Sequence, residues 1–410
     1  MKYFLLFFIV FMCTTAGMHA QVGWFQLRQE GETIFYSVDL YDENNITVVG
    51  SEGLILHSTD GGTTWASRPS GFDDNLRRIR YFSPTLGIIL GNSGFALKSS
   101  DGGASWQPLD VGETRTLYDI HFFDETRWMI TGQSGLITST TDAGSTWERS
   151  STGNNNFNEI DFRGDFGVIV GNVGTIRVTE NGGERWRDRG GVTNVMYHSV
   201  SIGDDSTAVA VGVNGVIVRT EDKGRTWTRI DASIPISFLQ LTGVRHLTRD
   251  IAISCGYSGI MLQTTDAGLT WYPQETNSPM NLEGLAFLDD KIGVATGGNG
   301  TVLRTNSGGT LSTLPLPLQN EQHLLIGETW PHPLSRAGAA GITVHLARSG
   351  WTRLRVQDML GRDIAVPYNG HLDAGTHAIR WNPSALPRGV YLYRLELNGQ
   401  IRMRSFVVAD

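Results

Sequence analysis

The sequence repeats itself at a nearly constant interval. A Gly-x-x-Gly step occurs seven times, and its second glycines are separated by 41, 41, 39, 41, 44 and 41 residues. These glycines are Gly53, Gly94, Gly135, Gly174, Gly215, Gly259 and Gly300. A fixed period of this length indicates successive copies of one supersecondary unit, so the chain must fold as a repeat architecture.

Short strand-like segments lie between successive steps. In the third copy they cover residues 117–123, 128–131 and 136–138, and a further segment starts at Trp147. Four short strands per copy are typical of a propeller blade. The sequence therefore predicts an all-β fold with a seven-bladed β-propeller over residues 21–312. A WD-repeat propeller is the nearest rival, but no tryptophan of the chain is followed by Asp.

A turn of the form Ser/Thr-x-Asp-x-Gly-x-x-Trp follows the Gly-x-x-Gly step. Asp accepts hydrogen bonds from nearby backbone N–H groups, and the indole ring can pack beneath the hairpin. We therefore expect structural roles for both residues. Six copies carry the pair: Asp60 and Trp65, Asp101 and Trp106, Asp142 and Trp147, Asn181 and Trp186, Asp222 and Trp227, and Asp266 and Trp271.

The seventh copy, around Ser307, lacks both the acid and the tryptophan. Trp24 lies one period of 41 residues before Trp65, near the start of the chain. This spacing predicts that an N-terminal strand containing Trp24 completes the last blade. Such a closure removes two exposed sheet edges.

These turns resemble Asp-box (bacterial neuraminidase) repeats, which occur in sialidases, xyloglucan-type glycosidases, sortilin-type receptors and photosystem II assembly factor-like proteins. The repeat therefore indicates a fold and not a reaction. The short, regular blades over residues 22–312 resemble the photosystem II assembly factor-like group, whose known members are binding scaffolds. The resemblance implies a rigid propeller that binds a partner; a photosynthetic partner does not carry over.

The first 20 residues have the pattern of a secretory signal peptide. Lys2 is followed by an apolar stretch from Tyr3 to Met12 and then by small residues, so we expect cleavage after Ala20. About 11 apolar residues are too few for a membrane-spanning helix, which needs roughly 20. Of the two cysteines, Cys13 lies in this leader, so the mature chain has no disulfide, and Cys255 lies in an apolar strand where we expect a buried hydrophobe.

A proline-containing linker, residues 313–324, precedes a second domain of alternating strands. We expect residues 325–410 to form a small Ig-like β-sandwich. Its ordered motifs are Trp330-Pro-His-Pro333 and residues 356–363, 374–377 and 386–394, and they resemble the C-terminal sorting domain of type IX secretion cargo. An unrelated carbohydrate-binding or immunoglobulin-like module is the alternative.

The sorting resemblance implies export through the type IX translocon. The protein would then be secreted or displayed on the outer-membrane surface of a Bacteroidota-type bacterium. His332 is a departure, because the family usually has Asn between the two prolines.

Composition argues against several functions. The formal net charge is −8 and only four of 33 basic residues are Lys, so we expect no basic surface that would bind nucleic acid. His-x-x-x-His and Cys-x-x-Cys spacings are missing from the sequence. We therefore expect no metal and no cofactor.

Catalytic residues are not predicted. A sialidase needs three arginines on its substrate's carboxylate, and Arg77, Arg78 and Arg80 are the nearest match. Alternation places Arg78 and Arg80 on one face of a strand and Arg77 on the other, and we interpret them as a solvated strand edge. The acid pairs Asp204-Asp205 and Asp289-Asp290 are weak candidates, because Asp favours turns.

We therefore expect a non-enzymatic exported scaffold that binds a protein or a polysaccharide. Exposed loop aromatics are the predicted contacts, namely Phe72, Phe157 and Tyr197. The alternative is a secreted glycoside hydrolase, sialidase-like or xyloglucan-type, which would need two carboxylates about 5 to 9.5 Å apart.

Overall fold

The computed structural model describes residues 23–29, 31–151, 153–230 and 240–309, and in the C-terminal part residues 324–330, 334–335, 340–346, 349–358, 362–384, 386–397 and 400–409. The predicted leader with Ala20 and residues 313–323 of the predicted linker lie outside the described residues. So do the three residues that separate Trp330 from Leu334.

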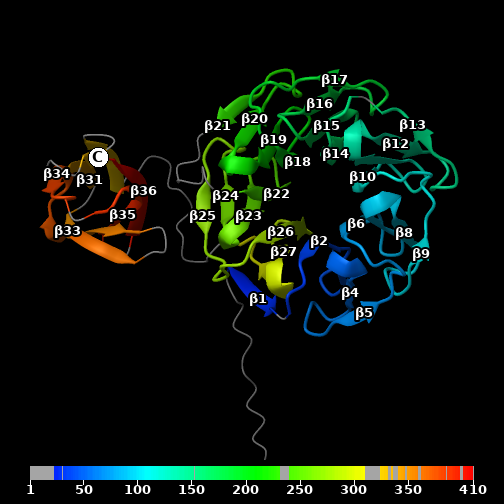
Figure 1. The fold of residues 1–410 in the computed structure, drawn as a ribbon, viewed down its shortest axis with the longest axis horizontal. Coiled ribbons are helices and arrows are strands. Elements are labelled where there is room, and N and C mark those ends of the chain that lie inside the picture. Colours follow the sequence, from blue (N-terminus) through cyan, green and yellow to red (C-terminus); the bar gives the residue numbers. More distant parts are fainter. Residues whose placement is uncertain are drawn as a thin grey trace, which may run out of the picture.

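In the described part of the chain, seven four-stranded antiparallel sheets form a ring (Figure 1). We number them in chain order. Sheet 1 consists of β2 (Phe35–Leu40), β3 (Ile46–Gly50), β4 (Ile55–Ser58) and β5 (Ala66–Arg68). Sheet 2 consists of β6 (Leu76–Tyr81), β7 (Gly87–Gly91), β8 (Ala96–Ser99) and β9 (Gln107–Pro108). Sheet 3 consists of β10 (Leu117–Phe122), β11 (Trp128–Gly132), β12 (Ile137–Thr140) and β13 (Glu148–Arg149).

The next three sheets repeat the same order of strands. Sheet 4 consists of β14 (Phe157–Arg163), β15 (Phe166–Gly171), β16 (Ile176–Thr179) and β17 (Arg187–Asp188). Sheet 5 consists of β18 (Tyr197–Ile202), β19 (Ala208–Gly212), β20 (Ile217–Thr220) and β21 (Thr228–Ile230). Sheet 6 consists of β22 (Leu241–His246), β23 (Ala252–Gly256), β24 (Met261–Thr264) and β25 (Tyr272–Gln274).

Sheet 7 joins the two ends of the ring. It consists of β26 (Leu282–Phe287), β27 (Ile292–Gly297), β28 (Val302–Asn306) and, as its outer strand, β1 (Trp24–Arg28). Trp24 lies opposite Thr305, and its indole nitrogen donates a 2.9 Å hydrogen bond to Oε1 of Gln274. The Trp24 ring also packs edge-on against Phe287. The start of the chain thus supplies the strand that β28 needs as a partner.

The Gly-x-x-Gly steps form tight turns between the second and third strands of the sheets. Six are short 3-10 segments: η1 (Ser51–Gly53), η2 (Asn92–Gly94), η3 (Gln133–Gly135), η4 (Val213–Gly215), η5 (Tyr257–Gly259) and η6 (Gly298–Gly300). Gly53 has a φ of +67°, and a Cβ added there would overlap the carbonyl oxygen of Phe72. The glycine is needed because the loop to the next sheet packs directly on this turn.

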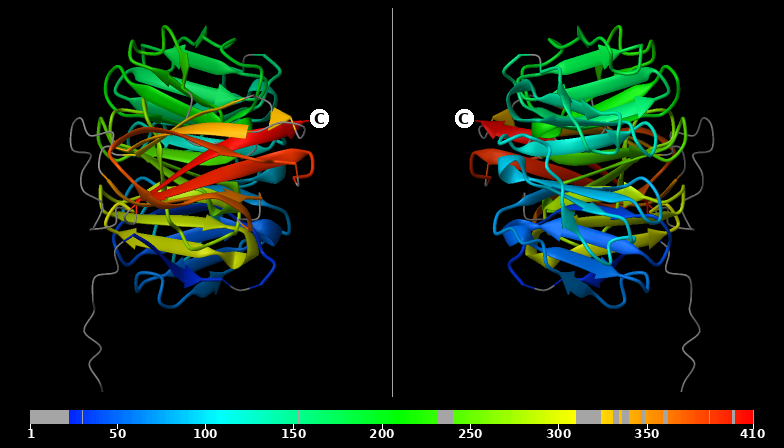
Figure 2. Two further views of the ribbon diagram at one scale, coloured as in Figure 1. Left: turned by 90° about the vertical axis from the view of Figure 1, so that its left-hand side faces the viewer. Right: turned by 90° about the vertical axis from the view of Figure 1, so that its right-hand side faces the viewer.

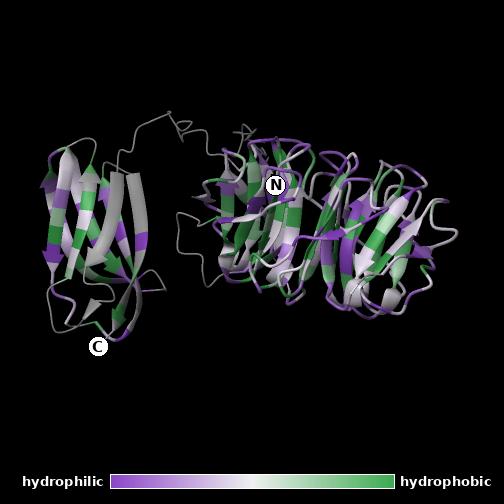
Figure 3. Ribbon diagram, turned by 90° about the horizontal axis from the view of Figure 1, so that it is seen from above, coloured by the Kyte–Doolittle hydropathy of each residue, from purple (hydrophilic) through white to green (hydrophobic). Residues whose placement is uncertain are grey.

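Apolar side chains fill the space between neighbouring sheets. The strands run along the axis of the ring (Figure 2), and their hydrophobic stretches are visible in Figure 3. Between sheets 4 and 5, for example, Val168 and Val170 pack with Val200 and Ala210, and all four are fully buried. Each sheet therefore buries both faces against its neighbours, which explains the apolar runs of the second strands.

The C-terminal residues form two further sheets. One has the order β29 (Leu324–Trp330), β31 (Ala340–Leu346) and β34 (Gly375–Trp381). The other has the order β30 (Leu334–Ser335), β36 (Gln400–Ala409), β35 (Gly389–Leu397), β32 (Gly350–Gln357) and β33 (Asp363–Leu372). Their shared core includes Ile342, Leu354, Tyr393 and Phe406. The predicted all-β fold class is thus confirmed.

None of the helical segments in the described part of the chain is long and apolar enough to span a membrane.

We predict that ring closure through β1 stabilises the whole propeller. Trp24 is 4% exposed, so Trp24→Ala should lower the free energy of unfolding by about 3–5 kcal/mol through the cavity and the lost hydrogen bond. Gln26→Ala, an exposed position of the same strand, is the control. Equal denaturant midpoints for the two variants would contradict the role of β1.

Candidate functional site: a polar cluster at the centre of the ring

The first strand of each sheet lies nearest the centre of the ring (Figure 1). These strands share a pattern in which the first, fourth and sixth positions are mostly apolar. The third and fifth positions share one face and the fourth and sixth positions the other, because side chains alternate along a strand. A β-bulge separates the first position from the third in all seven strands, so the first position does not follow this alternation. The third positions are Ser37, Arg78, Asp119, Glu159, Ser199, Gly243 and Gly284. The fifth positions are Asp39, Arg80, His121, Asp161, Ser201, Arg245 and Ala286.

Several of these side chains accept a hydrogen bond from the backbone of the next sheet. At the third position, Ser37 accepts from the N–H of Ile79 at 3.2 Å, and Glu159 accepts from the N–H of Val200 at 3.0 Å. The remaining bonds of this kind run from Ile160 to Asp119, Val244 to Ser199, Tyr81 to Asp39, Ile202 to Asp161 and His246 to Ser201. The first strand is an edge strand, so these N–H groups have no ladder partner on that side.

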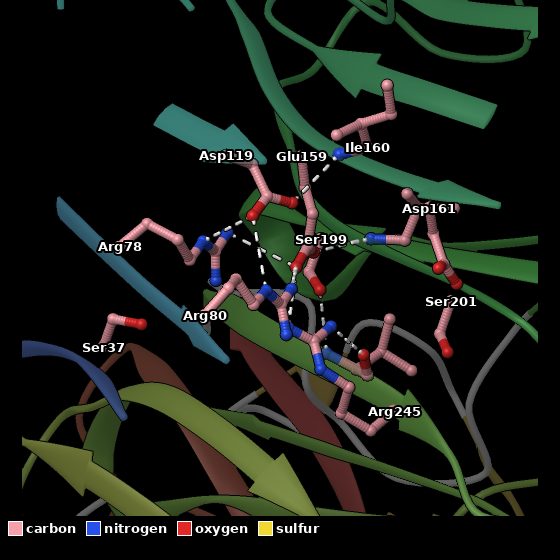
Figure 4. A network of polar contacts seen from close by, with 12 residues as sticks. Ser37, Arg78, Arg80, Asp119, Glu159, Ile160, Asp161, Ser199, Ser201 and Arg245 are labelled. Atoms are coloured by element: carbon pink, nitrogen blue, oxygen red, sulfur yellow. Dashed lines mark hydrogen bonds and ion pairs between the residues drawn. The ribbon is translucent and has the colours of Figure 1, made fainter. Parts of the chain in front are cut away.

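Three arginines from two sheets converge on one carboxylate (Figure 4). Oε1 of Glu159 lies 3.3 Å from a guanidinium nitrogen of Arg78, 3.1 Å from Arg80 and 2.8 Å from Arg245. Asp119 takes part as well, because its Oδ1 lies 2.9 Å from Nε of Arg78 and 3.5 Å from Nε of Arg80. The cluster therefore links sheets 2, 3, 4 and 6.

The carboxylate of Glu159 is held ionised. The side chains of Asp119 and Glu159 are 0% and 1% exposed, whereas the three arginines keep 16–23% of their surface. Burial alone would raise the pKa of Glu159, but the charges of Arg245, Arg78 and Arg80 outweigh it and lower the pKa to about 2. Glu159 is thus a permanent anion at neutral pH and no proton donor.

Asp161, two residues further along β14, behaves in the opposite way. Burial raises its pKa to about 6, although the N–H of Ile202 and the charge of Arg245 act against this rise. The carboxylate accepts hydrogen bonds from the N–H groups of Phe162 and Ile202. Its ionisation therefore weakens the folded state.

The interpretation of Arg78 and Arg80 as a solvated strand edge is wrong. Both face the centre of the ring and pair with Asp119 and Glu159. Arg77 does lie on the other face of β6, as alternation predicts, where it donates to Asn92 and stacks over the ring of Tyr36. The polar face of β6 meets other sheets instead of solvent because β6 is an innermost strand.

Two of the three predicted aromatic contacts are also placed wrongly. Phe157 is 1% exposed and Tyr197 is fully buried, so neither can offer a free ring to a ligand. Each opens a first strand, at the apolar first position that packs into the core. Phe72 is partly buried and stacks on Phe95 with ring centroids 3.9 Å apart.

The repeat turns share one hydrogen-bond pattern. In the turn of sheet 6, Thr264 donates to Oδ1 of Asp266 at 2.8 Å, and the same oxygen accepts from the N–H of Thr270. Oδ2 of Asp266 accepts from the hydroxyl of Thr270 at 2.6 Å. Asp60, Asp101, Asp142 and Asp222 repeat all three bonds. Side-chain hydrogen bonds lower the pKa of Asp101 and Asp142 to about 2.

The tryptophans that follow these turns are buried to different extents. Trp271 is fully buried and donates to the carbonyl of Gly268 at 3.1 Å. Trp106 and Trp227 are each 8% exposed. Trp65, Trp147 and Trp186 are partly buried.

The turn of sheet 4 differs from the other five. Asn181 accepts from Thr179 and from the N–H of Arg185 through Oδ1, at 2.8 and 3.0 Å. Four residues after Asn181 this turn has Arg185, where the other five turns have Ser or Thr. The turn thus keeps its backbone contacts but lacks the acid and its hydroxyl partner.

The remaining candidates have local roles. Oδ1 of Asp204 accepts from the N–H groups of Ser206 and Thr207, and Oδ1 of Asp289 does the same for Lys291 and Ile292, as turn residues do. Cys255 is fully buried, and burial raises its pKa to about 12. Within the described residues, no three His, Cys, Asp or Glu side chains are grouped as a metal ion would require.

Sequence reasoning missed most of the central cluster. Asp119 and Glu159 lie at the third position of consecutive copies, 40 residues apart, and Asp161 and Arg245 lie at the fifth position of sheets 4 and 6. The signal that could have found them is the third and fifth position of each first strand, aligned by the period. A ring brings those positions together even though no local motif connects them.

The ring of four-stranded sheets defines the fold as a β-propeller. The chain belongs to the family described as photosynthesis system II assembly factor YCF48, whose model matches residues 16–114 and 104–228, just over half of the chain. No curated protein matches the chain as a relative.

The chain also resembles solved propellers. It is 20% identical to a structure of YCF48 bound to a D1 peptide, with a TM-score of 0.59 over 70% of this chain and 95% of that chain. YCF48 from Cyanidioschyzon merolae gives 17% identity and a TM-score of 0.59, over 69% and 98% of the two chains. The WD40 β-propeller domain of Doa1 gives 13% and 0.56, over 70% and 97%. At these identities the likeness shows a shared fold.

We predict that the ring depends on Glu159 as the counter-ion of three arginines. Glu159→Gln should lower the free energy of unfolding by about 3–5 kcal/mol, because it removes the carboxylate partner of Arg245 and leaves Arg78 and Arg80 with Asp119 alone. Asp205→Asn breaks an exposed pair with Arg163 and should cost at most about 1 kcal/mol. Chemical denaturation measures both, and a loss from Glu159→Gln no larger than the control would contradict this role.

We predict a pH-dependent effect at Asp161. The folded-state pKa of about 6 exceeds the ordinary value of 3.8, so the folded state holds a proton that the unfolded state releases, and stability from this group falls as pH rises from about 4 to 6. Asp161→Ser removes this loss, because Ser201 shows that a hydroxyl can accept the same kind of N–H. The variant should therefore gain roughly 2–3 kcal/mol on the wild type between pH 4 and pH 7.

Ser201→Ala is the matched control for Asp161→Ser, because Ser201 occupies the same position in sheet 5 and carries no charge. Its stability difference from the wild type should not change over that pH range. A pH-independent difference for Asp161→Ser as well would contradict the raised pKa.

We predict that the second oxygen of the turn acid is less important than the first. Asp266→Ala should cost about 1 kcal/mol of unfolding free energy, since the N–H of Thr270 and two hydroxyl groups lose their acceptor. Asp266→Asn should cost less than half of this, because Asn181 supports the same turn in sheet 4. Equal losses for the two variants, measured by thermal or chemical unfolding, would contradict this ranking.

Proposed function

We propose that the chain is a non-enzymatic propeller scaffold that binds a segment of another protein. It belongs to the YCF48 family, and one solved member of that family carries a bound D1 peptide. We propose that this chain shares the mode of action, in which a rigid ring holds a peptide, and we do not propose the same partner. We also propose that the repeat turns are Asp boxes, since their acids cap the turns in the way described above.

The central ion cluster is the observation that carries the scaffold function. Three arginines that could hold a foreign carboxylate are occupied by Glu159 and Asp119 of the chain itself. The cluster connects four sheets, and both Asp119 and Glu159 are paired with arginines of the chain. Such an arrangement favours a rigid binding surface over a catalytic site. A surface that is already ordered loses less entropy when a partner binds.

Hydrolysis of glycosides is not part of the proposal. Such enzymes need a carboxylic acid that donates a proton to the leaving oxygen, with a pKa raised toward neutrality. Glu159 has a pKa of about 2 and is paired with guanidinium groups. Asp161 has a raised pKa of about 6, but it is buried and its two oxygens accept hydrogen bonds from the N–H groups of Phe162 and Ile202. The arginines that a sialidase would direct at its substrate already have a partner.

We further propose that the protein is exported and acts outside the inner membrane. The signal-peptide pattern of residues 1–20 and the ordered motifs of the C-terminal domain support this route. In this proposal the C-terminal sandwich directs the propeller to the type IX translocon. The propeller then works as a secreted or surface-displayed binding module.

Peptide binding can be tested with the full mature chain. Random peptides displayed on phage are selected on the immobilised protein, and enriched sequences are measured as synthetic peptides by calorimetry. Saturable binding at one peptide per chain, with cross-links that map to residues 23–309, supports the proposal. Failure of every selected peptide to bind, together with time-dependent release of sugars from polysaccharides, would contradict it.

Export can be tested separately in a Bacteroidota-type host. The surface-exposed or secreted protein should begin at Gln21, and deletion of residues 325–410 should retain the propeller inside the cell envelope. Efficient appearance of the truncated protein outside the cell would contradict the sorting role while leaving the peptide-binding proposal intact.

A further inference from the structure

A hollow of about 590 Å³ lies where the repeat turns of sheets 4 and 5 meet. Five basic residues line it, namely Arg185, Arg187, Arg189, Lys223 and Arg225. Only two acids, Glu180 and Glu184, oppose them, so the lining has a formal excess of three positive charges. This excess is unusual in a chain whose net charge is −8.

Comparison with the other five repeat turns shows which residues of the sheet 4 turn add positive charge. In the five other turns an Asp oxygen accepts from the hydroxyl of the Ser or Thr four residues later. The turn of sheet 4 has Asn181 and Arg185 at these two positions. Both differences make the site more positive, and they occur in the same turn. Asn181 still makes the turn's structural bonds, so folding of the turn does not require the change.

Three of the arginines come from one short stretch of chain. Arg185 lies in the turn of sheet 4, Arg187 in β17 and Arg189 directly after this strand, and all three line the hollow. The two residues between them make other contacts: Trp186 packs against Phe162, and Asp188 pairs with Arg177 at 3.4 Å.

Glu180 brings the cations of the two sheets together. Its carboxylate lies 3.1 Å from Arg225 of the sheet 5 turn and 3.7 Å from Arg187 of β17. Hydrogen bonding to Arg225 lowers the pKa of Glu180, so the bridge persists at neutral pH. Arg187 and Arg225 nevertheless keep 61% of their side chains exposed and can turn further donors to a ligand.

The chemistry of the lining indicates the ligand. Guanidinium groups are planar forks that bind phosphate oxygens in pairs, and several of them suit a group with more than one negative charge. A phosphate monoester carries about −1.5 to −2 and three strong acceptor oxygens, whereas a carboxylate carries −1. Val178 is the one apolar residue of the lining, and no aromatic ring is present there to stack on a sugar.

We propose that this hollow, between the turns of sheets 4 and 5, binds a multiply charged phosphate group. The phosphate can belong to a soluble phosphate ester or to a lipid headgroup, since both present the same oxygens. The site is separate from the central cluster, and it does not depend on the peptide-binding role.

The test uses the full mature chain and two probes. Inorganic pyrophosphate is titrated by calorimetry, and vesicles of phosphatidylcholine with or without phosphatidic acid are used in a flotation assay. Binding of pyrophosphate should be saturable at one site per chain and should weaken as salt is raised. Binding to the phosphatidic acid vesicles alone would assign the phosphate to a lipid.

The decisive variant combines Asn181→Asp with Arg185→Thr. It restores the sequence pattern of the other turns, so it should fold, and unchanged circular dichroism and denaturant midpoint verify this. Its affinity for the bound probe should fall at least about tenfold, because two charges change at the hollow. Arg249→Gln, which removes an exposed cation paired with Asp204 elsewhere, should leave the affinity unchanged.

Two results would overturn the proposal. One is the failure of both probes to bind the wild-type chain saturably. The other is binding that the restored turn does not weaken, or that Arg249→Gln weakens as much, since either would show general charge attraction without a site.

Discussion

The ring depends on hydrogen bonds between the first strands of neighbouring sheets, which join sheet 1 to sheet 2 and connect sheets 3, 4, 5 and 6 in series. These strands have an unpaired edge, and their free N–H groups would be costly to bury. Side chains at the third and fifth positions of the preceding sheet accept them, as Glu159 does for Val200 and Ser199 for Val244. The same positions therefore explain both the joining of neighbouring sheets and the polarity of the centre.

The charged cluster is a local elaboration of this arrangement. Sheet 2 has arginines at the two positions where sheets 1, 4 and 5 have acceptors, and Arg78 and Arg80 extend across the centre to Asp119 and Glu159. Arg245 of sheet 6 reaches the same Glu159 oxygen from another direction. A carboxylate that both accepts a neighbour's N–H and neutralises three guanidinium groups has little freedom left for catalysis.

The sequence predicted the architecture because its signals are local and repeated. The period, the turn chemistry around residues such as Asp142, and the spacing of Trp24 to Trp65 all depend on short stretches of chain. It did not predict the central cluster. Alternation shows that Arg78 and Arg80 share a face, but whether that face meets water or other sheets depends on how the ring closes. The prediction that Phe157 and Tyr197 are exposed is wrong for the same reason.

Amide hydrogen exchange of the first strands tests most directly whether these hydrogen bonds hold the ring together. If the N–H groups of Ile160, Val200 and Val244 are held by side chains of the preceding sheet, they should exchange only when the propeller unfolds globally. Their exchange free energies should then equal the global free energy of unfolding. Exchange at the much lower free energies of exposed turn amides would contradict the claim that these bonds hold the ring together.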